Sequence, residues 1–359
     1  MDFRLSDDQR ALRAGMRDLL AARFPREALR ALVDGSPGAA GEKPRFRPSE
    51  GSDGPVRELW RVLGDAGLFA LRLPEEEGGA GLGLPEAVLL FEEAGRALLP
   101  GPLVATHLAA GLVPGAAEGT RIVTAVDGTG IIERLTTADA VLLLDSATAS
   151  VLATDGHGTP LLAAGEAIRS VDPATPLHRV RQRPAPLGAG SLEVTADAAR
   201  LRRAGALLTA AQQLGSAGAT LGLAVEHARR RVQFGRPVGS FQAVQHLCAD
   251  MCVRTELARV SVYSASLSGE ETDISASKMI ADGAAVRNAR DCLQVCGGLG
   301  FTWEADVHLH LKRAWVRAGQ WQSAAEAEEF LAGDLLADRT EEVSRGGVSP
   351  ALGSENAGL

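Results

Sequence analysis

The sequence has little cysteine, few aromatic side chains and no surplus of positive charge. Its 359 residues include 4 cysteines and 1 tyrosine, and aromatic residues make up 4%. Lysine and arginine number 37 against 45 aspartate and glutamate residues, which gives a net charge of -8. Proteins that bind the phosphate backbone of nucleic acids concentrate positive charge on one face. We therefore expect no nucleic-acid partner.

Long apolar runs are also missing. No stretch approaches the roughly 20 apolar residues that a membrane-spanning helix needs. Residues 1–6 have neither the basic region nor the apolar core of a signal peptide. We expect no membrane partner and a cytoplasmic location.

The cysteines form two pairs with helical spacing, Cys248 with Cys252 and Cys292 with Cys296. A metal site and core packing are both open interpretations. Paired cysteines in zinc sites usually sit on turns with closer spacing, whereas free cysteine is among the most buried residue types. Neighbours one helical turn apart also cannot easily reach disulfide geometry. The spacing favours small core residues and no metal site.

The chain is rich in apolar residues, 45% of the total, which supports a sizeable core. Residues 6–9 have the form of a capping box, and leucine and methionine follow at helical spacing, so an amphipathic helix is predicted there. Helical pattern resumes at residues 56–66 and 85–99. Residues 34–55 are rich in glycine, proline, serine and charge, and are predicted to form a loop.

The pattern changes between residues 120 and 194, where short aliphatic runs alternate with glycine, aspartate and proline. The runs at residues 122–126, 140–144 and 151–154 are predicted strands of a small β domain. Three long helices and then a fourth are predicted for the rest of the chain. They span residues 201–232, 241–268, 273–296 and 307–338.

The second of these helices is expected to bury one apolar stripe, made of Val244, Leu247, Met251 and Leu257. The order of helices, strands and helices lacks the long alternation of a doubly wound nucleotide fold. The predicted class is mainly α with a small β domain. Its predicted parts are an N-terminal helical domain at residues 1–115, a shortened middle β domain at 116–198, a C-terminal helical bundle at 199–340 and a flexible tail at 341–359.

Three passages resemble the acyl-CoA dehydrogenase family. Residues 74–81 and 91–96 are similar to its N-terminal domain, residues 231–238 contain an Arg-x-x-Phe segment, and residues 294–304 contain Gln-x-x-Gly-Gly. The run Phe-Thr-Trp-Glu at residues 301–304 resembles in particular the actinobacterial members that act on steroid side chains. The resemblance implies the family fold, which consists of an N-terminal helical domain, a middle β domain and a C-terminal four-helix bundle.

The resemblance also implies FAD as cofactor and an acyl-CoA thioester as substrate. In the family, the residues that correspond to Arg231 and Phe234 reach the FAD of a neighbouring subunit. Those that correspond to Gln294 and Gly298 meet the ADP portion across another interface. The expected partner is therefore a homologous family subunit or a second copy of the chain. The cofactor-binding candidates are Arg231, Phe234, Gln242, Gln294, Gly297 and Gly298.

These residue types suit a pyrophosphate, which needs fixed positive charge and close backbone approach. Each motif alone has a simpler explanation. The basic triplet at residues 229–231 lies at a predicted helix end, where cations are usually solvated. The glycines at 297 and 298 are typical of a helix C-cap. The joint occurrence of both motifs favours the cofactor site.

The family's catalytic base is missing at both places where the resemblance puts it. The base removes an α proton while a hydride passes from the β carbon to flavin N5. In most members it follows the Gly-Gly motif, which corresponds here to Gln-Trp-Gln-Ser at residues 320–323. In isovaleryl-type members it lies on the helix before Arg-x-x-Phe, at about Gly205 here. The family's middle-domain loop is also reduced, at residues 124–130. No catalytic residue is assigned.

These features leave three hypotheses. The first is the base-lacking subunit of a hetero-oligomeric acyl-CoA dehydrogenase, which helps to bind an FAD seated mainly in its partner. The second is a complete homo-oligomeric enzyme with another base, for which Glu304 and Glu326 are the nearest carboxylates. The third is a flavin-free scaffold or binding subunit that kept the fold and lost the chemistry.

Overall fold

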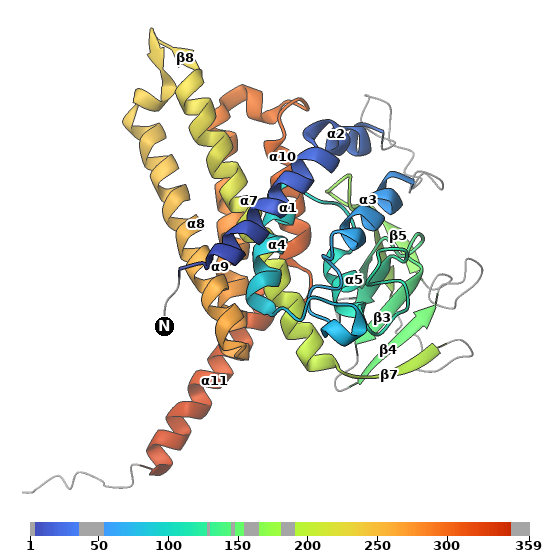
Figure 1. Ribbon diagram of the computed structural model, residues 1–359. Helices are drawn as coiled ribbons and strands as arrows, with labels where there is room; N and C mark the ends of the chain where they lie inside the picture. The colour runs from blue at the N-terminus through green and yellow to red at the C-terminus, as the bar shows by residue number, and fades with distance from the viewer. Residues whose placement is uncertain are drawn as a thin grey trace, which may run out of the picture.

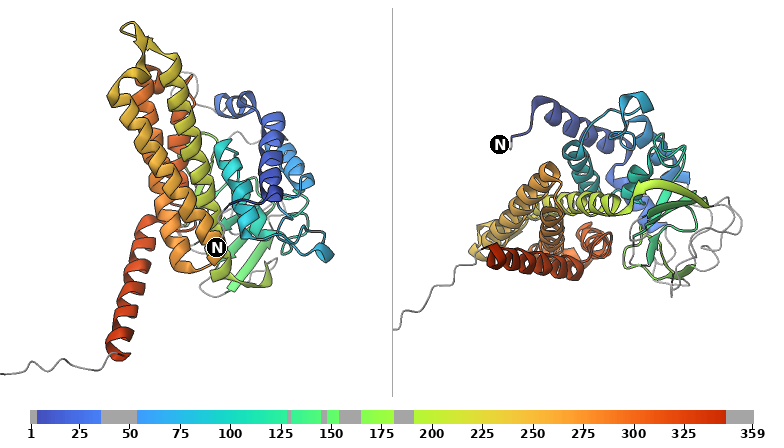
Figure 2. Two further views of the ribbon diagram at one scale, coloured as in Figure 1. Left: turned by 60° about the vertical axis from the view of Figure 1, so that its left-hand side comes forward. Right: turned by 90° about the horizontal axis from the view of Figure 1, so that it is seen from below.

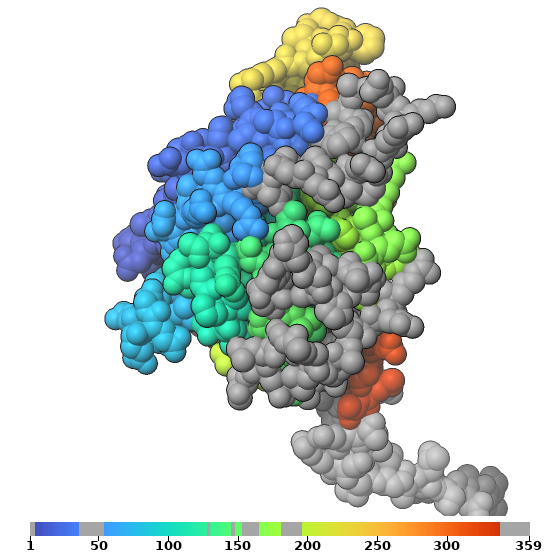
Figure 3. Space-filling view, turned by 90° about the vertical axis from the view of Figure 1, so that its right-hand side faces the viewer, coloured from blue at the N-terminus to red at the C-terminus, as the bar shows by residue number. Residues whose placement is uncertain are grey.

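The chain is mainly helical with a small β domain, which confirms the predicted fold class. The computed structural model describes residues 4–35, 54–127, 130–144, 148–153, 165–180 and 191–345, so most of the predicted loop and the end of the predicted tail lie outside the described residues. Figures 1 and 2 show a bundle of long helices with the N-terminal helices and the β domain beside it. In Figure 3 these last two parts share one face of the molecule.

In the N-terminal part, the helix Leu84–Arg96 (α4) packs against the helix Asp7–Arg23 (α1) and against the C-terminal bundle. The first helix begins at the predicted capping box, where the Gln9 N–H donates to Ser6 Oγ at 3.1 Å. No pattern predicts the helices Arg26–Asp34 and Leu103–Ala109, because their 9 and 7 residues are too few to show a clear period. The elements are α1 (Asp7–Arg23), α2 (Arg26–Asp34), α3 (Gly54–Asp65), the 3-10 turn η1 (Glu75–Glu77), α4 (Leu84–Arg96) and α5 (Leu103–Ala109).

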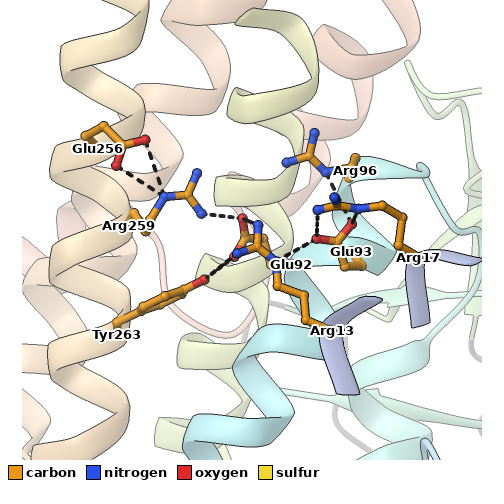
Figure 4. A network of polar contacts seen from close by, with 8 residues as sticks. All are labelled: Arg13, Arg17, Glu92, Glu93, Arg96, Glu256, Arg259 and Tyr263. Atoms are coloured by element: carbon orange, nitrogen blue, oxygen red, sulfur yellow. Dashed lines mark hydrogen bonds and ion pairs between the residues drawn. The ribbon is translucent and has the colours of Figure 1, made fainter. Parts of the chain in front are cut away.

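The central helix α4 carries two adjacent buried carboxylates, Glu92 and Glu93. Each accepts hydrogen bonds from side chains of other helices, so that charge is neutralised where water is excluded. Figure 4 shows the network, which joins α4 to α1 and to the bundle. The donors are Arg13, Arg259 and Tyr263 to Glu92, and Arg13 and Arg17 to Glu93.

Two small sheets form the β domain among the described residues. The first has the order β1-β3-β4-β7, with β1 parallel to β3 and the other pairs antiparallel. The second is antiparallel, in the order β2-β6-β5. The strands are β1 (Val123–Val126), β2 (Ile131–Glu133), β3 (Ala140–Leu144), β4 (Thr148–Ala153), β5 (Gly165–Ile168), β6 (Leu177–Val180) and β7 (Ser191–Asp197).

The strand β3 is buried on both faces, as its continuous apolar run predicts. Leu142 and Leu144 pack into a core that includes Ala109 from α5. Val141 and Leu143 face the other way, into a core shared with the second sheet. The first sheet therefore packs between the N-terminal helix α5 on one face and the second sheet on the other.

Long helices form the bundle, and the predicted segments at residues 201–232, 241–268 and 273–296 are confirmed as helices. They run up, down and up, with a hairpin of two short strands after the first. The elements are α7 (Ala198–Arg230), β8 (Val232–Gln233), β9 (Arg236–Pro237), η2 (Val238–Ser240), α8 (Gln242–Ser268), α9 (Glu271–Cys296), η3 (Gly297–Phe301), α10 (Val307–Ala318) and α11 (Ala324–Arg345).

The prediction of one helix over residues 307–338 is wrong, because the chain breaks between α10 and α11. Gly319 caps α10, and Trp321 adopts a left-handed backbone with φ of 64°, which no continuous α-helix permits. The second helix, α11, then projects past the end of the bundle (Figure 2). It includes residues 341–345 of the predicted tail.

Two finer predictions for the bundle need correction. Leu257 does not join the buried stripe of α8 and is 55% exposed, whereas Met251 is fully buried. Six residues turn a helix by about 600°, which places Leu257 on a different face from Met251. Among the cysteines, Cys292 is buried as expected, but Cys252 is exposed.

His107 on α5 makes the fold sensitive to acid. Its ring packs edge-on against Phe91, and Nδ1 lies 3.0 Å from the Leu68 carbonyl oxygen. Burial lowers the pKa of His107 to about 4. The unfolded chain, with a histidine pKa near 6.5, therefore takes up the proton first.

We expect this histidine to cost stability as the pH falls from about 6.5 to about 4, by up to about 1.4 kcal/mol per pH unit. The variant His107→Gln should show a shallower fall of the melting temperature across this window. The exposed His246 offers the matched control, His246→Gln. Equal pH profiles for the two variants would contradict the prediction.

Candidate functional site

The Arg-x-x-Phe segment forms a hairpin at one end of the bundle. Arg231 caps the C-terminus of α7, and its carbonyl accepts from the Val238 N–H at 2.8 Å. Phe234 and Gly235 both have positive φ, 53° and 78°, as the two central residues of a type I′ turn require. The Phe234 side chain is 91% exposed. The hairpin therefore presents an aromatic ring to solvent on a backbone that a non-glycine residue rarely adopts.

The Gln-x-x-Gly-Gly segment lies at the C-terminus of α9. Gly297 is the C-cap with φ of 59°, so the simpler interpretation of the glycines as a helix cap describes its local conformation. Gln294 and Gly298 are exposed, and a Cβ on Gly298 would meet nothing within 4 Å. The exposed Gln242 begins α8. In Figure 1 these helix ends lie at the same end of the bundle as the hairpin.

These groups face outward, so they suit a ligand that lies across the surface, such as the ADP portion of FAD, and not one enclosed in a pocket. A guanidinium, an amide and uncovered glycine backbone are the donors that a pyrophosphate needs. All six cofactor-binding candidates are exposed in this chain, so they do not enclose a ligand by themselves.

A small polar cavity lies between the β domain and the bundle, far from that end. Its volume is about 40 Å³. A water molecule needs about 10–15 Å³ by this measure, so the cavity holds a few waters and no flavin ring or thioester. Its polar lining consists of Thr124, Asp127, Glu133, Gln212, Arg317 and Gln320, together with Thr175 and Arg313.

Charged groups in this wall are only partly compensated. Burial raises the pKa of Glu133, although Arg313, Arg134 and Arg317 oppose the shift. Burial also lowers the pKa of Arg317 to about 9, and Arg313 adds to that effect. Arg313 itself is paired with the buried Asp172. The cavity therefore combines a carboxyl group whose pKa is raised by burial with a guanidinium whose pKa is lowered by burial.

The structure brings the two expected base positions together. Trp321, from residues 320–323, packs against Gly205 on α7, and a Cβ on Gly205 would lie under 3.0 Å from three atoms of the indole. The Trp321 N–H donates to Asp127 Oδ2 at 2.6 Å. Next to it, Gln320 Nε2 donates to Glu133 Oε2 at 3.4 Å. An indole ring thus occupies the space where both positions meet, and neither position has a carboxylate.

The two alternative carboxylates lie elsewhere. Glu326 accepts from the Ser323 N–H and hydroxyl at 2.7 Å each, which is the capping of α11. Glu304 is exposed on the turn before α10. Glu133 and Asp127 are carboxylates that line the cavity, and no sequence signal points to Glu133 because its strand has only 3 residues. Asp127, which fixes Trp321, carries no signal either.

Other kinds of site find no support in the described part of the chain. Its histidines, cysteines and carboxylates form no group of three or more that could hold a metal ion. None of its helices is long and apolar enough to cross a bilayer.

Comparisons with known proteins match most of the chain. Residues 39–121 match the family model described as acyl-CoA dehydrogenase, N-terminal domain. Residues 199–319 match the model described as acyl-CoA dehydrogenase, C-terminal domain.

Two curated proteins of Mycobacterium tuberculosis are similar in sequence. The acyl-CoA dehydrogenase IpdE2 is 34% identical over 314 residues, which cover 86% of this chain and 96% of that protein. The acyl-CoA dehydrogenase FadE34 is 36% identical over 289 residues, which cover 74% of this chain. The match spans 40% of the length of FadE34.

Solved structures with this fold include the two that follow. The ChsE4-ChsE5 complex from Mycobacterium tuberculosis matches with a TM-score of 0.70 at 24% identity, over 98% of this chain and 100% of that chain. A variant of the steroid acyl-CoA dehydrogenase Tcur3481-Tcur3483 matches with a TM-score of 0.73 at 23% identity, over 93% of this chain and 99% of that chain. At these identities the likeness shows the fold.

Proposed function

Because the chain belongs to the acyl-CoA dehydrogenase family of FAD-dependent oxidoreductases, we propose that it is the base-lacking subunit of a hetero-oligomeric member. A homologous partner subunit supplies the carboxylate that removes the α proton. The substrate is an acyl-CoA thioester, and a bulky, steroid-derived acyl group is the proposed class. The proposed location is the cytoplasm.

One observation carries the proposal: Gly205 and Trp321, which stand where the family resemblance puts the base, pack on each other. A general base must lie within hydrogen-bond reach of the proton that it removes. Neither residue can accept a proton, and the cavity beside them is too small for a thioester. These features support a reaction site to which this chain contributes only in part.

The contribution proposed for this chain is at the hairpin end of the bundle. Arg231, Gln294 and the backbone at Gly298 would hold the pyrophosphate and ADP portion of FAD through charge-assisted and amide hydrogen bonds. Phe234 would pack against the cofactor in the neighbouring subunit, with Gln242 and Gly297 beside these groups. The bound FAD supplies the hydride acceptor of the reaction.

A second candidate is the complete homo-oligomeric enzyme, and Glu133 is the observation that favours it. This carboxyl group lies in the cavity wall and accepts a hydrogen bond from Gln320, in the segment where most family members carry the base. Burial raises its pKa, which is the direction of shift that a carboxylate general base needs. Substitution by glutamine separates this candidate from the first.

The test compares the chain alone with the chain co-expressed with a homologous partner subunit. Alone, it is expected to retain little FAD and to reduce no dye with any acyl-CoA. The complex is expected to be yellow and active. Within the complex, Arg231→Ala should lower the FAD content, whereas Arg229→Ala, in the same exposed basic triplet, should not.

Other outcomes separate the alternatives. Rapid turnover by the chain alone would refute the base-lacking subunit. If Glu133→Gln abolished that turnover while FAD stayed bound, Glu133 would be the base of a complete enzyme. A complex without flavin absorbance would favour the scaffold of the third hypothesis.

A further inference from the structure

Trp321 connects two parts of the core. Its indole packs against the large core that includes Leu207 and Leu208 of α7, and also against the β-domain core around Leu142. It forms part of the wall of the 40 Å³ cavity. A single side chain from the turn between α10 and α11 thus fills the junction of bundle and β domain.

The backbone at Trp321 is strained. Its φ of 64° lies in the left-handed region, which a bulky residue adopts only when its surroundings hold it there. Three features do so: the 2.6 Å hydrogen bond from its N–H to Asp127 Oδ2, the tight turn in which the Gln322 N–H donates to the Gln320 carbonyl at 2.8 Å, and the indole packing. Strain of this kind points to a function for the residue.

Gly205 leaves the space that the indole of Trp321 fills. Any side chain on Gly205 would collide with the ring, since a Cβ alone would lie under 3.0 Å from three ring atoms. The flanking Ala204 and Ala206 are small and buried. The surface of α7 is therefore shaped to receive a flat aromatic ring, and Trp321 supplies that ring from within the chain.

From this geometry we infer that Trp321 is a plug. It fills a latent site for a flat, fused aromatic ring and keeps the isoalloxazine ring of FAD out of this subunit. The inference rests on the proposed function in taking flavin as the ring that is excluded. The inference adds that one side chain excludes the ring by filling its space. A subunit that only lacked the base could still have room for the ring.

The test removes the plug from the full chain and offers it the ring without the rest of the cofactor. In Trp321→Gly the side chain is gone and glycine accepts the positive φ without strain. Indole should raise the melting temperature of this variant, because it refills the opened space. Lumiflavin, the isoalloxazine ring alone, should bind the variant at least about tenfold more tightly than the unchanged chain, measured by quenching of its fluorescence.

Trp315→Ala is the matched control, because Trp315 is an indole on α10 that is 43% exposed and outside the cavity wall. It should gain neither indole stabilisation nor lumiflavin binding. If Trp321→Gly does not fold, Trp321→Ala replaces it, and folding that depends on added indole supports the plug.

Two results would overturn the inference. One is equal lumiflavin binding by the unchanged chain and the folded variant. The other is a folded variant that indole stabilises but that does not bind lumiflavin, since the ring would then be excluded by other groups. Both measurements are made on the chain by itself. The proposed function is tested separately, by the FAD content and turnover of the complex, so a negative result here does not change that test.

Discussion

Glu92→Gln is expected to lower the free energy of unfolding by about 3–5 kcal/mol, which is the usual cost of removing one partner from a buried ion pair. Glu92 is fully buried and holds two arginines and a tyrosine. Arg259 and the Tyr263 hydroxyl each donate to it at 2.6 Å, and Arg13 donates at 3.0 Å (Figure 4). Glutamine keeps the shape and removes the charge, so the two partly buried guanidinium groups lose the fully buried carboxylate that they share. Arg13 then keeps Glu93 as an ion-pair partner, and Arg259 keeps the exposed Glu256.

Glu256→Gln is the matched control for this variant. Glu256 also pairs with Arg259, at 3.3 Å, but its side chain is 58% exposed. An exposed pair of this kind contributes between 0 and about 1 kcal/mol. The midpoint of urea unfolding should therefore fall sharply for Glu92→Gln and little for Glu256→Gln. Similar midpoints for the two variants would show that the network does not depend on the buried charge.

Tyr263 gives a second readout of the same substitution, since it is the single tyrosine of the chain. Burial raises the pKa of Tyr263, and the negative charge of Glu92 raises it further. Without that charge the pKa should move down toward its ordinary value. A spectrophotometric titration sees this residue alone and should detect tyrosinate at lower pH in Glu92→Gln. An unchanged titration of the folded variant would contradict the proposed role of Glu92.

Local chemistry was sufficient to predict some elements. The reciprocal bonds of Ser6 and Gln9 lie within four residues, so the start of α1 is visible in the sequence. The helices α7, α8 and α9 are long enough for their periodicity to be clear. The family resemblance also selected the segments that hold Arg231 and Gln294, whose role in binding FAD stays a prediction.

Contacts between distant parts of the chain explain what could not be predicted. The turn at Trp321 packs its indole on Gly205, which is distant in the sequence and leaves room for the ring only because it has no side chain. Adjacent glutamates such as Glu92 and Glu93 are usually solvated, and only the arginines of other helices allow their burial. Glu133 likewise belongs to the cavity only because the fold brings β2 to Gln320, which follows α10. Each of these features is a property of the assembled fold.

The same fold contains an unusually close approach of two helices. At the crossing of α4 and α7, a Cβ on Gly95 would lie under 3.0 Å from backbone atoms of Gln212. A Cβ on Gly215 would in turn lie under 3.0 Å from the Glu92 carbonyl and the Arg96 nitrogen. Paired glycines thus bring the two backbones together. This approach also sets the position of Glu92 relative to α7 and α8, and so of the whole charged network.

Gly215→Ala should therefore cost about 3 kcal/mol or more, at the upper end of overpacking effects, because the atoms in the way are backbone and cannot rotate aside. Gly222→Ala tests the same change on the same helix at an exposed position where a Cβ would meet nothing within 4 Å. There alanine should stabilise the protein by about 0.5–1 kcal/mol, since it restricts the unfolded chain and favours helix. Urea unfolding of both variants gives the comparison. Shifts of opposite sign are expected. A Gly215→Ala variant as stable as the unchanged chain would mean that α4 and α7 can move apart without a loss of free energy of unfolding. The close approach of the two helices would then not fix the position of Glu92.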